Sequence, residues 1–397
     1  MIEALLLAAA LADPAAEYAQ RAAKVPDKDA KGWLALADFC EEGLLWESRA
    51  EALRKAAAAD PENPQAHARL DEKRWDGKWI PAGEAEAAEI GANRARGLAY
   101  QGAKWVQPKD AEKSRDADRK AVGWACDFRM DTRRLSIYSS QPLEETWRLA
   151  ALLESELDAY LRLYGPVWKL EAKPRPFRIY VFGDRGTFEK VMKADTGSAP
   201  QPWQVGYYYA GNQVLYVGRS DEATSGNSER VTAKLAVHEM LHALDHQWAH
   251  LDLGHAAIPM WLVEGRADHF GNAVSGRQVL PGSLHLPPQD AEPNDLGKIL
   301  PALSPGALMD LSREAFAAES QVEHYALSWA LVHYLLHAEN GRRGPAFRAF
   351  LKGMPARASR AEFEKAVGKL SEIEPAFKAW AEGTLVPASL ASREEGR

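Results

Sequence analysis

Histidine is unevenly distributed along this chain of 397 residues, and no other sequence feature constrains the fold as strongly. Ten of the eleven histidines lie at or beyond His238, and five of them fall within the 18 residues from His238 to His255. Histidine is the commonest metal ligand among the side chains. The cluster therefore predicts a metal site in the second half of the chain.

The cluster begins with His238-Glu-Met-Leu-His242, an HExxH pattern. Apolar residues recur with helical spacing from Val231 to Leu241, so the pattern lies on a predicted helix, with Ser228 as its N-cap. Because His238 and His242 are four residues apart, they lie on one face of this helix and can bind one Zn²⁺ together. Glu239 is rotated off that face, so it can reach a metal-bound water rather than the metal.

A catalytic zinc of this type needs a third protein ligand and one open position. The extended pattern with a third histidine requires glycine at position 245 and histidine at position 248. This chain has Asp245 and Trp248 there, so that class is excluded.

The segment Met260-Trp-Leu-Val-Glu-Gly-Arg-Ala-Asp-His269 lies farther along the chain. It resembles the gluzincin metallopeptidases, in which a glutamate on a second helix completes the zinc site. Its central part is similar to Trp-Leu-Asn-Glu-Gly-Phe-Ala of the aminopeptidase-N branch, which implies Glu264 as the third ligand. Similarity to the thermolysin branch implies that Asp268 accepts the outer N–H of a zinc-bound histidine. The alternative for Asp268 is a solvated carboxylate.

A second similarity lies 61 residues after Glu264. Tyr325-Ala-Leu-Ser-Trp resembles the aminopeptidase-N helix that begins Tyr-Glu-Lys-Gly, although Ser328 stands where that family has glycine. The resemblance implies that Tyr325 donates to the oxyanion of the tetrahedral intermediate. The alternative is an ordinary interfacial tyrosine, in which case His324 and His333 are other candidate donors.

One departure from the aminopeptidase-N branch concerns the predicted hairpin from Tyr207 to Val217. Those enzymes carry a Gly-x-Met-Glu-Asn strand whose glutamate holds the free amine of the substrate. The comparable segment here, Gly206-Tyr-Tyr-Tyr-Ala-Gly-Asn212, contains no glutamate. The choice between endopeptidase and exopeptidase specificity therefore stays open. We still expect the hairpin to supply an edge strand that pairs with an extended substrate.

Predicted strands precede predicted helices after residue 121, which is typical of an α+β fold. Alternating residues predict a hairpin over 124–137, helical spacing predicts a helix over 143–164 that stops at Gly165, and Phe177–Phe182 is a predicted strand. After residue 217 we expect only helices and loops.

The resemblance implies a zincin-like domain over residues 121–390, with an antiparallel or mixed sheet followed by a helical subdomain and a polar tail at 391–397. The arrangement is similar to a bacterial zincin-like domain family of unassigned function that helical repeats often precede.

Residues 15–83 are rich in alanine and helical in pattern. Six of them fall near the packing positions of a tetratricopeptide-type hairpin: Trp33, Leu36, Ala37, Cys40, Leu53 and Ala56. We expect a small all-α, TPR-like segment here, either a groove for a protein partner or an appended helical layer. Residues 84–120 are charged and rich in Ala and Gly, which predicts a linker. Residues 1–14 form either a signal peptide or a first helix, so the localisation stays open.

Composition excludes several classes of partner. With 49 basic and 56 acidic residues the net charge is −7, so no global basic field attracts nucleic acid or anionic lipid. Two cysteines, Cys40 and Cys126, are too few for a disulfide framework and are expected to be buried thiols. After the N-terminus, no stretch approaches the roughly 18 uninterrupted apolar residues of a membrane span.

The sequence therefore predicts a zinc-dependent hydrolase of gluzincin type that acts on a peptide or protein. Zn²⁺ would bind His238, His242 and Glu264, while Glu239 activates the metal-bound water. One alternative is a protein-interaction scaffold with a catalytically silent zincin domain. Intact Glu239 argues against it, because a scaffold has no chemical need for a general base. The other alternative is a zinc hydrolase that acts on a non-peptide bond.

Overall fold

The computed structural model describes most of the chain: residues 14–171, 175–202, 204–219, 228–252, 254, 258–283, 303–318, 321–354 and 356–385. The predicted signal peptide or first helix falls almost wholly outside the described residues, and the predicted polar tail does so entirely. The chain divides into two compact units. One contains residues 1–91 with 337–342, and the other contains residues 92–336 with 343–397.

The first unit is mainly helical. Its helices are α2 (Pro14–Ala22), α3 (Ala30–Glu42), α4 (Trp46–Ala59) and α5 (Pro64–Arg69). The six residues expected at packing positions are all buried in its core: Trp33, Leu36, Ala37, Cys40, Leu53 and Ala56. A hairpin follows, with β1 (Glu72–Trp75) antiparallel to β2 (Lys78–Pro81). Its turn residues Asp76 and Gly77 both have positive φ, as a two-residue hairpin turn requires.

The stretch predicted as a linker, residues 84–120, is largely regular instead. It contains helices α6 (Ala82–Ala95) and α7 (Pro108–Val122), with the hairpin β3 (Ala99–Gln101) and β4 (Lys104–Val106) between them. Alanine and glutamate are strong helix formers, so the composition that suggested a linker also suits two exposed helices.

The larger unit contains a mixed five-stranded sheet in the order β5-β6-β7-β9-β8. Its strands are β5 (Phe128–Asp131), β6 (Leu135–Ser139), β7 (Phe177–Val181), β8 (Gly206–Tyr209) and β9 (Val214–Val217). Both predicted hairpins are present as antiparallel pairs, β5–β6 and β8–β9. The inner pairs, β6–β7 and β7–β9, are parallel. In this sheet β8 is an edge strand, as predicted.

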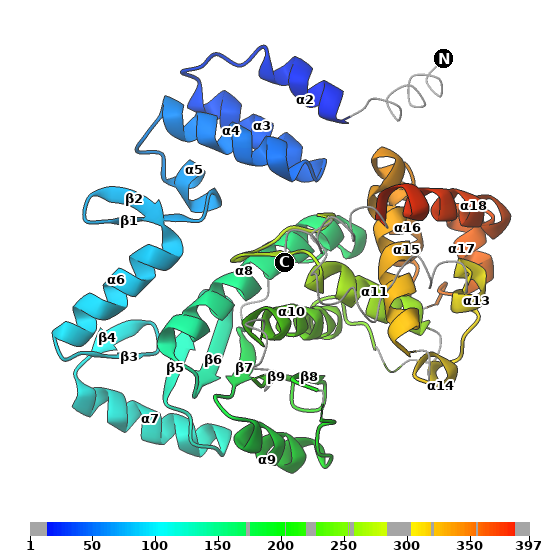
Figure 1. The fold of residues 1–397 in the computed structure, drawn as a ribbon. Helices are drawn as coiled ribbons and strands as arrows, with labels where there is room; N and C mark the ends of the chain where they lie inside the picture. Colours follow the sequence, from blue (N-terminus) through cyan, green and yellow to red (C-terminus); the bar gives the residue numbers. More distant parts are fainter. Residues whose placement is uncertain are drawn as a thin grey trace. The chain divides into compact units, whose positions relative to one another are not determined.

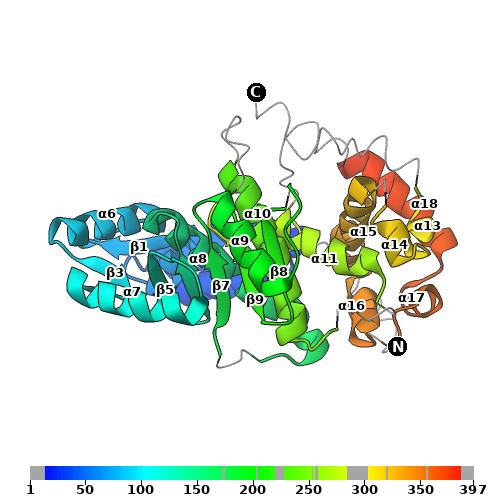
Figure 2. The same cartoon turned by 90° about the horizontal axis from the view of Figure 1, so that it is seen from below.

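Helices cover both faces of this sheet (Figures 1 and 2). Helices α8 (Leu143–Trp168) and α10 (Ser228–Gln247) lie on one face, and α9 (Arg185–Thr196) lies on the other. The α9 face is rich in aromatic residues, among them Tyr180 and Tyr216. A parallel pair needs a crossover connection, and α8 supplies it between β6 and β7.

Helix α8 runs beyond the predicted stop at Gly165. It continues through Pro166 to Trp168 and ends at Lys169, which has a positive φ of 55°. The rings of Tyr164 and Trp168 pack against each other at a centroid distance of 5.4 Å, with their planes tilted by 35°. This aromatic packing outweighs the weak helix propensity of the Gly-Pro pair, so the helix gains one more turn.

After α10, the described part of the chain is mostly helical. Its helices are α11 (Met260–Gly271), α13 (Pro305–Met309), α14 (Arg313–Phe316), α15 (Gln321–Gly341), α16 (Gly344–Lys352), α17 (Arg360–Val367), α18 (Leu370–Trp380) and the π-helix η1 (Ala381–Leu385). The short hairpin β10 (Val274–Ser275) and β11 (Gln278–Val279) corrects the expectation of helices and loops alone. It was missed because two-residue strands leave no alternation to detect.

The fold is therefore of the mixed α+β class, as predicted. Both cysteines are buried free thiols, also as predicted. Within the described part of the chain, the helices are too short or too polar to cross a membrane.

Candidate metal centre

Two packed helices, α10 and α11, bring together the three predicted ligands. The Nε2 atoms of His238 and His242 are 3.2 Å apart. Glu264 Oε2 lies 3.1 Å from His238 Nε2 and 3.7 Å from His242 Nε2. Two imidazole nitrogens and one carboxylate oxygen thus point at a common centre.

The spacing of these atoms fits a zinc ion. Tetrahedral coordination at about 2.0–2.1 Å separates neighbouring ligand atoms by about 3.4 Å. The three observed separations, 3.1, 3.2 and 3.7 Å, bracket that value. His238 and Glu264 are each only 7% exposed. A buried carboxylate between two imidazoles needs a compensating positive charge, which a divalent cation supplies.

Asp268 occupies the position that the resemblance implied. Its Oδ1 lies 2.9 Å from His238 Nδ1, on the side of the ring away from the other ligands. The contact makes Nδ1 the protonated nitrogen and leaves the Nε2 lone pair for a metal. Of the two candidate roles of Asp268, the structure therefore favours the support of His238.

Electrostatics in the group favour positive charge at its centre. Burial disfavours the charged imidazolium, yet the carboxylates of Asp268 and Glu264 raise the pKa of His238 well above its usual value. Burial likewise opposes the charge on His242, and Glu264 raises its pKa. Burial acts to raise the pKa of Glu264, but the two imidazoles outweigh it and lower that pKa.

Glu239 lies beside the three ligands and is not one of them. It is half-buried, and its Oε2 accepts a hydrogen bond of 2.9 Å from the backbone N–H of Tyr208 on edge strand β8. A Cβ added at Gly206 would lie 3.1 Å from Glu239 Cγ. Glycine at that position therefore allows β8 to approach α10 closely enough for this bond. The local sequence does not reveal either contact, because each depends on the packing of a distant strand.

Tyr325 lies next to His238. The two rings are stacked at a centroid distance of 6.3 Å and an interplanar angle of 20°. The alternative donors have other partners. His324 bonds through Nδ1 to the backbone oxygen of Phe316, and His333 stacks on Trp380 at 5.7 Å.

His269 and His333 differ from the two candidate ligands His238 and His242. Their rings are 5.9 Å apart, and both are buried. Burial lowers the pKa of His269 well below its usual value and that of His333 to about 3. Both are thus uncharged at neutral pH, and neither contributes an atom to the group around Glu264.

A buried ion pair joins the two helices of the candidate site. Arg266 donates two hydrogen bonds to Asp245, of 2.6 and 2.8 Å, and both side chains are at most 1% exposed. Tyr160 of α8 donates to the same carboxylate at 2.7 Å, and the guanidinium lies over Tyr164 at 4.3 Å. This network was not predicted from the sequence. The available signal was Arg266 itself, which stands where the aminopeptidase-N pattern has phenylalanine.

Two glycines set the spacing of the helices around the candidate site. A Cβ at Gly265, the residue after Glu264, would lie 2.5 Å from the backbone oxygen of Ser328 on α15. A Cβ at Gly271 would lie 3.1 Å from the backbone oxygen of Lys234 on α10. The close approach of α11 to both neighbours therefore depends on glycine, and this approach determines where Glu264 lies.

Comparison with protein-family models gave no match to this chain, and neither did comparison with curated proteins. The geometry of the site and its sequence motifs therefore carry the functional assignment.

Proposed function

We propose that this chain is a zinc-dependent hydrolase of gluzincin type that cleaves peptide bonds. One observation carries the proposal. Two imidazole nitrogens and one carboxylate oxygen converge at 3.1–3.7 Å, with the HExxH glutamate beside them. The motifs around His238 and Glu264 support a zincin-like fold for the larger unit as part of the same proposal. The buried helical pair at the N-terminus supports a TPR-like segment.

His238, His242 and Glu264 would hold the zinc. When bound, the ion supplies Lewis acidity and makes water more acidic, which is what hydrolysis at neutral pH requires. Asp268 keeps the proton of His238 on Nδ1, so that the lone pair of Nε2 is available to bind the zinc.

Glu239 serves as the general base. Its Oε2 is held by the Tyr208 N–H, so Oε1 takes the proton from the attacking water. Glu239 then returns that proton to the nitrogen of the leaving amine. The same carboxylate thus acts first as base and then as acid.

Tyr325 and strand β8 contact the substrate in this proposal. The Tyr325 hydroxyl donates to the oxygen on which negative charge develops in the transition state. The edge of β8 that does not pair with β9 faces Glu239, and an extended substrate adds to the sheet along that edge.

The experiment measures zinc content and proteolysis on one preparation. We expect about one zinc per chain by elemental analysis, and new peptide termini when the protein is incubated with a pool of denatured proteins. A chelator should abolish cleavage and added zinc should restore it, whereas the exposed variant Glu372→Gln should behave like the wild type.

Zinc retention without any cleavage of the pool would contradict the peptidase proposal. A protein that holds no zinc would contradict the whole site.

A further inference from the structure

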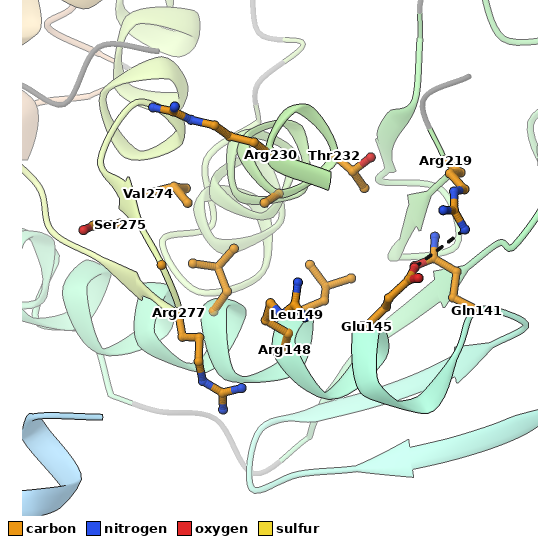
Figure 3. A pocket seen from close by; sticks show the side chains of 13 residues that line it. Gln141, Glu145, Arg148, Leu149, Arg219, Arg230, Thr232, Val274, Ser275 and Arg277 are labelled. Carbon is orange, nitrogen blue, oxygen red and sulfur yellow. Dashed lines mark ion pairs between the residues drawn. The ribbon is translucent and has the colours of Figure 1, made fainter. Parts of the chain in front are cut away.

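A pocket of about 880 Å³ lies in the larger unit, between α8, the first turns of α10 and the hairpin β10–β11 (Figure 3). This volume is typical of ligand sites, which measure roughly 300–1,000 Å³. The ligands His238, His242 and Glu264 are not among the described residues that line it. The pocket is therefore distinct from the candidate metal centre.

Positive charge gathers at this pocket. Four arginines line it, each from a different segment: Arg148 of α8, Arg219 after β9, Arg230 of α10 and Arg277 of the β10–β11 hairpin. Among the described lining residues they are accompanied by one acidic side chain, Glu145, whose Oε2 is 3.7 Å from Arg219. The chain as a whole carries a net charge of −7, so a pocket lined by four arginines differs in sign from its surroundings. The pocket is thus an attractive site for an anion on an otherwise acidic protein.

The same pocket has apolar walls. Leu149 and Leu152 of α8 line it, only 9% and 2% exposed, and Val274 lines it from the hairpin. A small inorganic anion would contact the arginines but not Val274, the most exposed of these three apolar side chains. Nucleic acid is disfavoured because its bases need aromatic stacking platforms, and the described lining contains no aromatic side chain. A chain that carries both carboxylates and aliphatic groups matches both parts of the lining.

The elements that build the pocket also build the metal centre. Arg230 is eight residues before His238 on α10, which corresponds to about 12 Å along the helix axis. The hairpin begins three residues after Gly271, whose Cα faces the backbone of Lys234 on α10. An extended peptide covers about 13 Å in four residues, so one substrate can span this distance.

We propose that this pocket binds an acidic, aliphatic segment of a polypeptide substrate, about four residues from the cleaved bond. The inference rests on the proposed hydrolase function, and it names the substrate class: polypeptides in which Asp or Glu alternates with aliphatic residues. The arginines recognise the carboxylates, while Leu149, Leu152 and Val274 contact the aliphatic groups.

Binding is measured on the Glu239→Gln variant, which leaves the probe uncleaved. The probe is a fluorescein-labelled peptide of alternating Glu and Leu, and its partner is the same peptide with Gln in place of Glu. Fluorescence anisotropy should show tighter binding of the Glu peptide, and salt should weaken that binding because exposed charge pairs are screened.

Charge reversal locates the binding. Arg148→Glu and Arg277→Glu, each made in the Glu239→Gln background, should weaken binding of the Glu peptide by roughly three- to thirtyfold, because each removes one attraction and adds one repulsion. The matched control is Arg133→Glu, an exposed arginine in the β5–β6 turn that does not line the pocket. Thermal melts of all variants check that they are folded.

The outcomes separate this inference from the proposed function. Equal binding of the Glu and Gln peptides overturns the proposed peptide site, even when the wild type cleaves peptides. The site is also overturned if Arg148→Glu and Arg277→Glu bind the Glu peptide no more weakly than Arg133→Glu does. Displacement of the Glu peptide by inorganic phosphate at the peptide's own Kd overturns it too, because the site would then be one for small anions. If binding depends on Arg148 but the wild type cleaves nothing, the hydrolase proposal fails and the peptide site stands.

Discussion

His238 illustrates how much of the account depends on single atoms. Its Nδ1 contacts Asp268 at 2.9 Å, and its Nε2 faces both Glu264 and His242. The HExxH pattern alone predicted that the two histidines lie together and singled out Glu239 as the proposed base, because helical spacing fixes which side chains share a face. The identity of Glu264 needed the resemblance, since its proximity is created by a second helix.

Asp268→Ala should weaken zinc binding by about 10- to 100-fold, because the outer N–H of His238 loses its acceptor. The fold should be retained, since Asp268 is near the end of α11 and is half-buried. Competition with a chromogenic chelator measures the affinity. Undiminished affinity would show that Asp268 does not orient the histidine.

Tyr325→Phe removes a single hydroxyl. If that group donates to the oxyanion, kcat should fall by about 10²–10³-fold while KM changes little, because the contact is made mainly in the transition state. Steady-state kinetics on a cleaved peptide tests this, with a thermal melt as control. Normal kcat with a lowered Tm would instead make Tyr325 a packing residue.

At the scale of elements, local patterns predicted what local patterns can encode. Alternation predicted the β5–β6 and β8–β9 hairpins, and periodicity predicted α10. The parallel pairing of β6 with β7 was not predictable, because it joins strands that α8 separates in sequence. The Asp245–Arg266 pair was not predictable either, because it links residues of two different helices, α10 and α11. The helical character of residues 84–120 was missed for another reason, since their composition suited both a linker and helices.

Gly265→Ala should be strongly disruptive, because its Cβ would lie 2.5 Å from the backbone of Ser328. Overpacking of this kind costs typically 1–3 kcal/mol, and separating α11 from α15 should also displace Glu264 and weaken zinc binding. Urea denaturation and zinc titration measure the two effects.

The control is Gly165→Ala in α8, where the added Cβ meets no atom within 4 Å. Alanine should stabilise that helix by up to about 1 kcal/mol. Equal stability of the two variants would contradict the argument that Gly265 sets the helix spacing.

At the scale of the whole molecule, the α+β class followed from the order of predicted strands and helices. The buried positions of the N-terminal helices followed from their spacing. The pocket lined by four arginines could not be predicted from the sequence, because these arginines come from segments as far apart as residues 148 and 277. Sequence patterns along one element cannot show that such residues meet.

Removal of the metal should destabilise the larger unit. A ligand that binds only the folded state adds about 4 kcal/mol at a thousandfold excess over its Kd. EDTA should therefore lower the Tm of the wild type by several degrees, and it should leave the Tm of Glu264→Ala nearly unchanged. Scanning calorimetry with and without the chelator gives both values, and an equal shift in the two proteins would mean that the metal binds elsewhere.

The kinetics of Glu239→Gln test whether this carboxylate is the general base. The substitution keeps the size of the side chain and removes the base, so bound zinc should stay at about one per chain while kcat falls by at least about 10²-fold. Zinc content and kcat are measured on one preparation and compared with Glu372→Gln. Wild-type turnover by Glu239→Gln with zinc still bound would contradict the assignment of Glu239 as general base, and with it the proposed mechanism of hydrolysis.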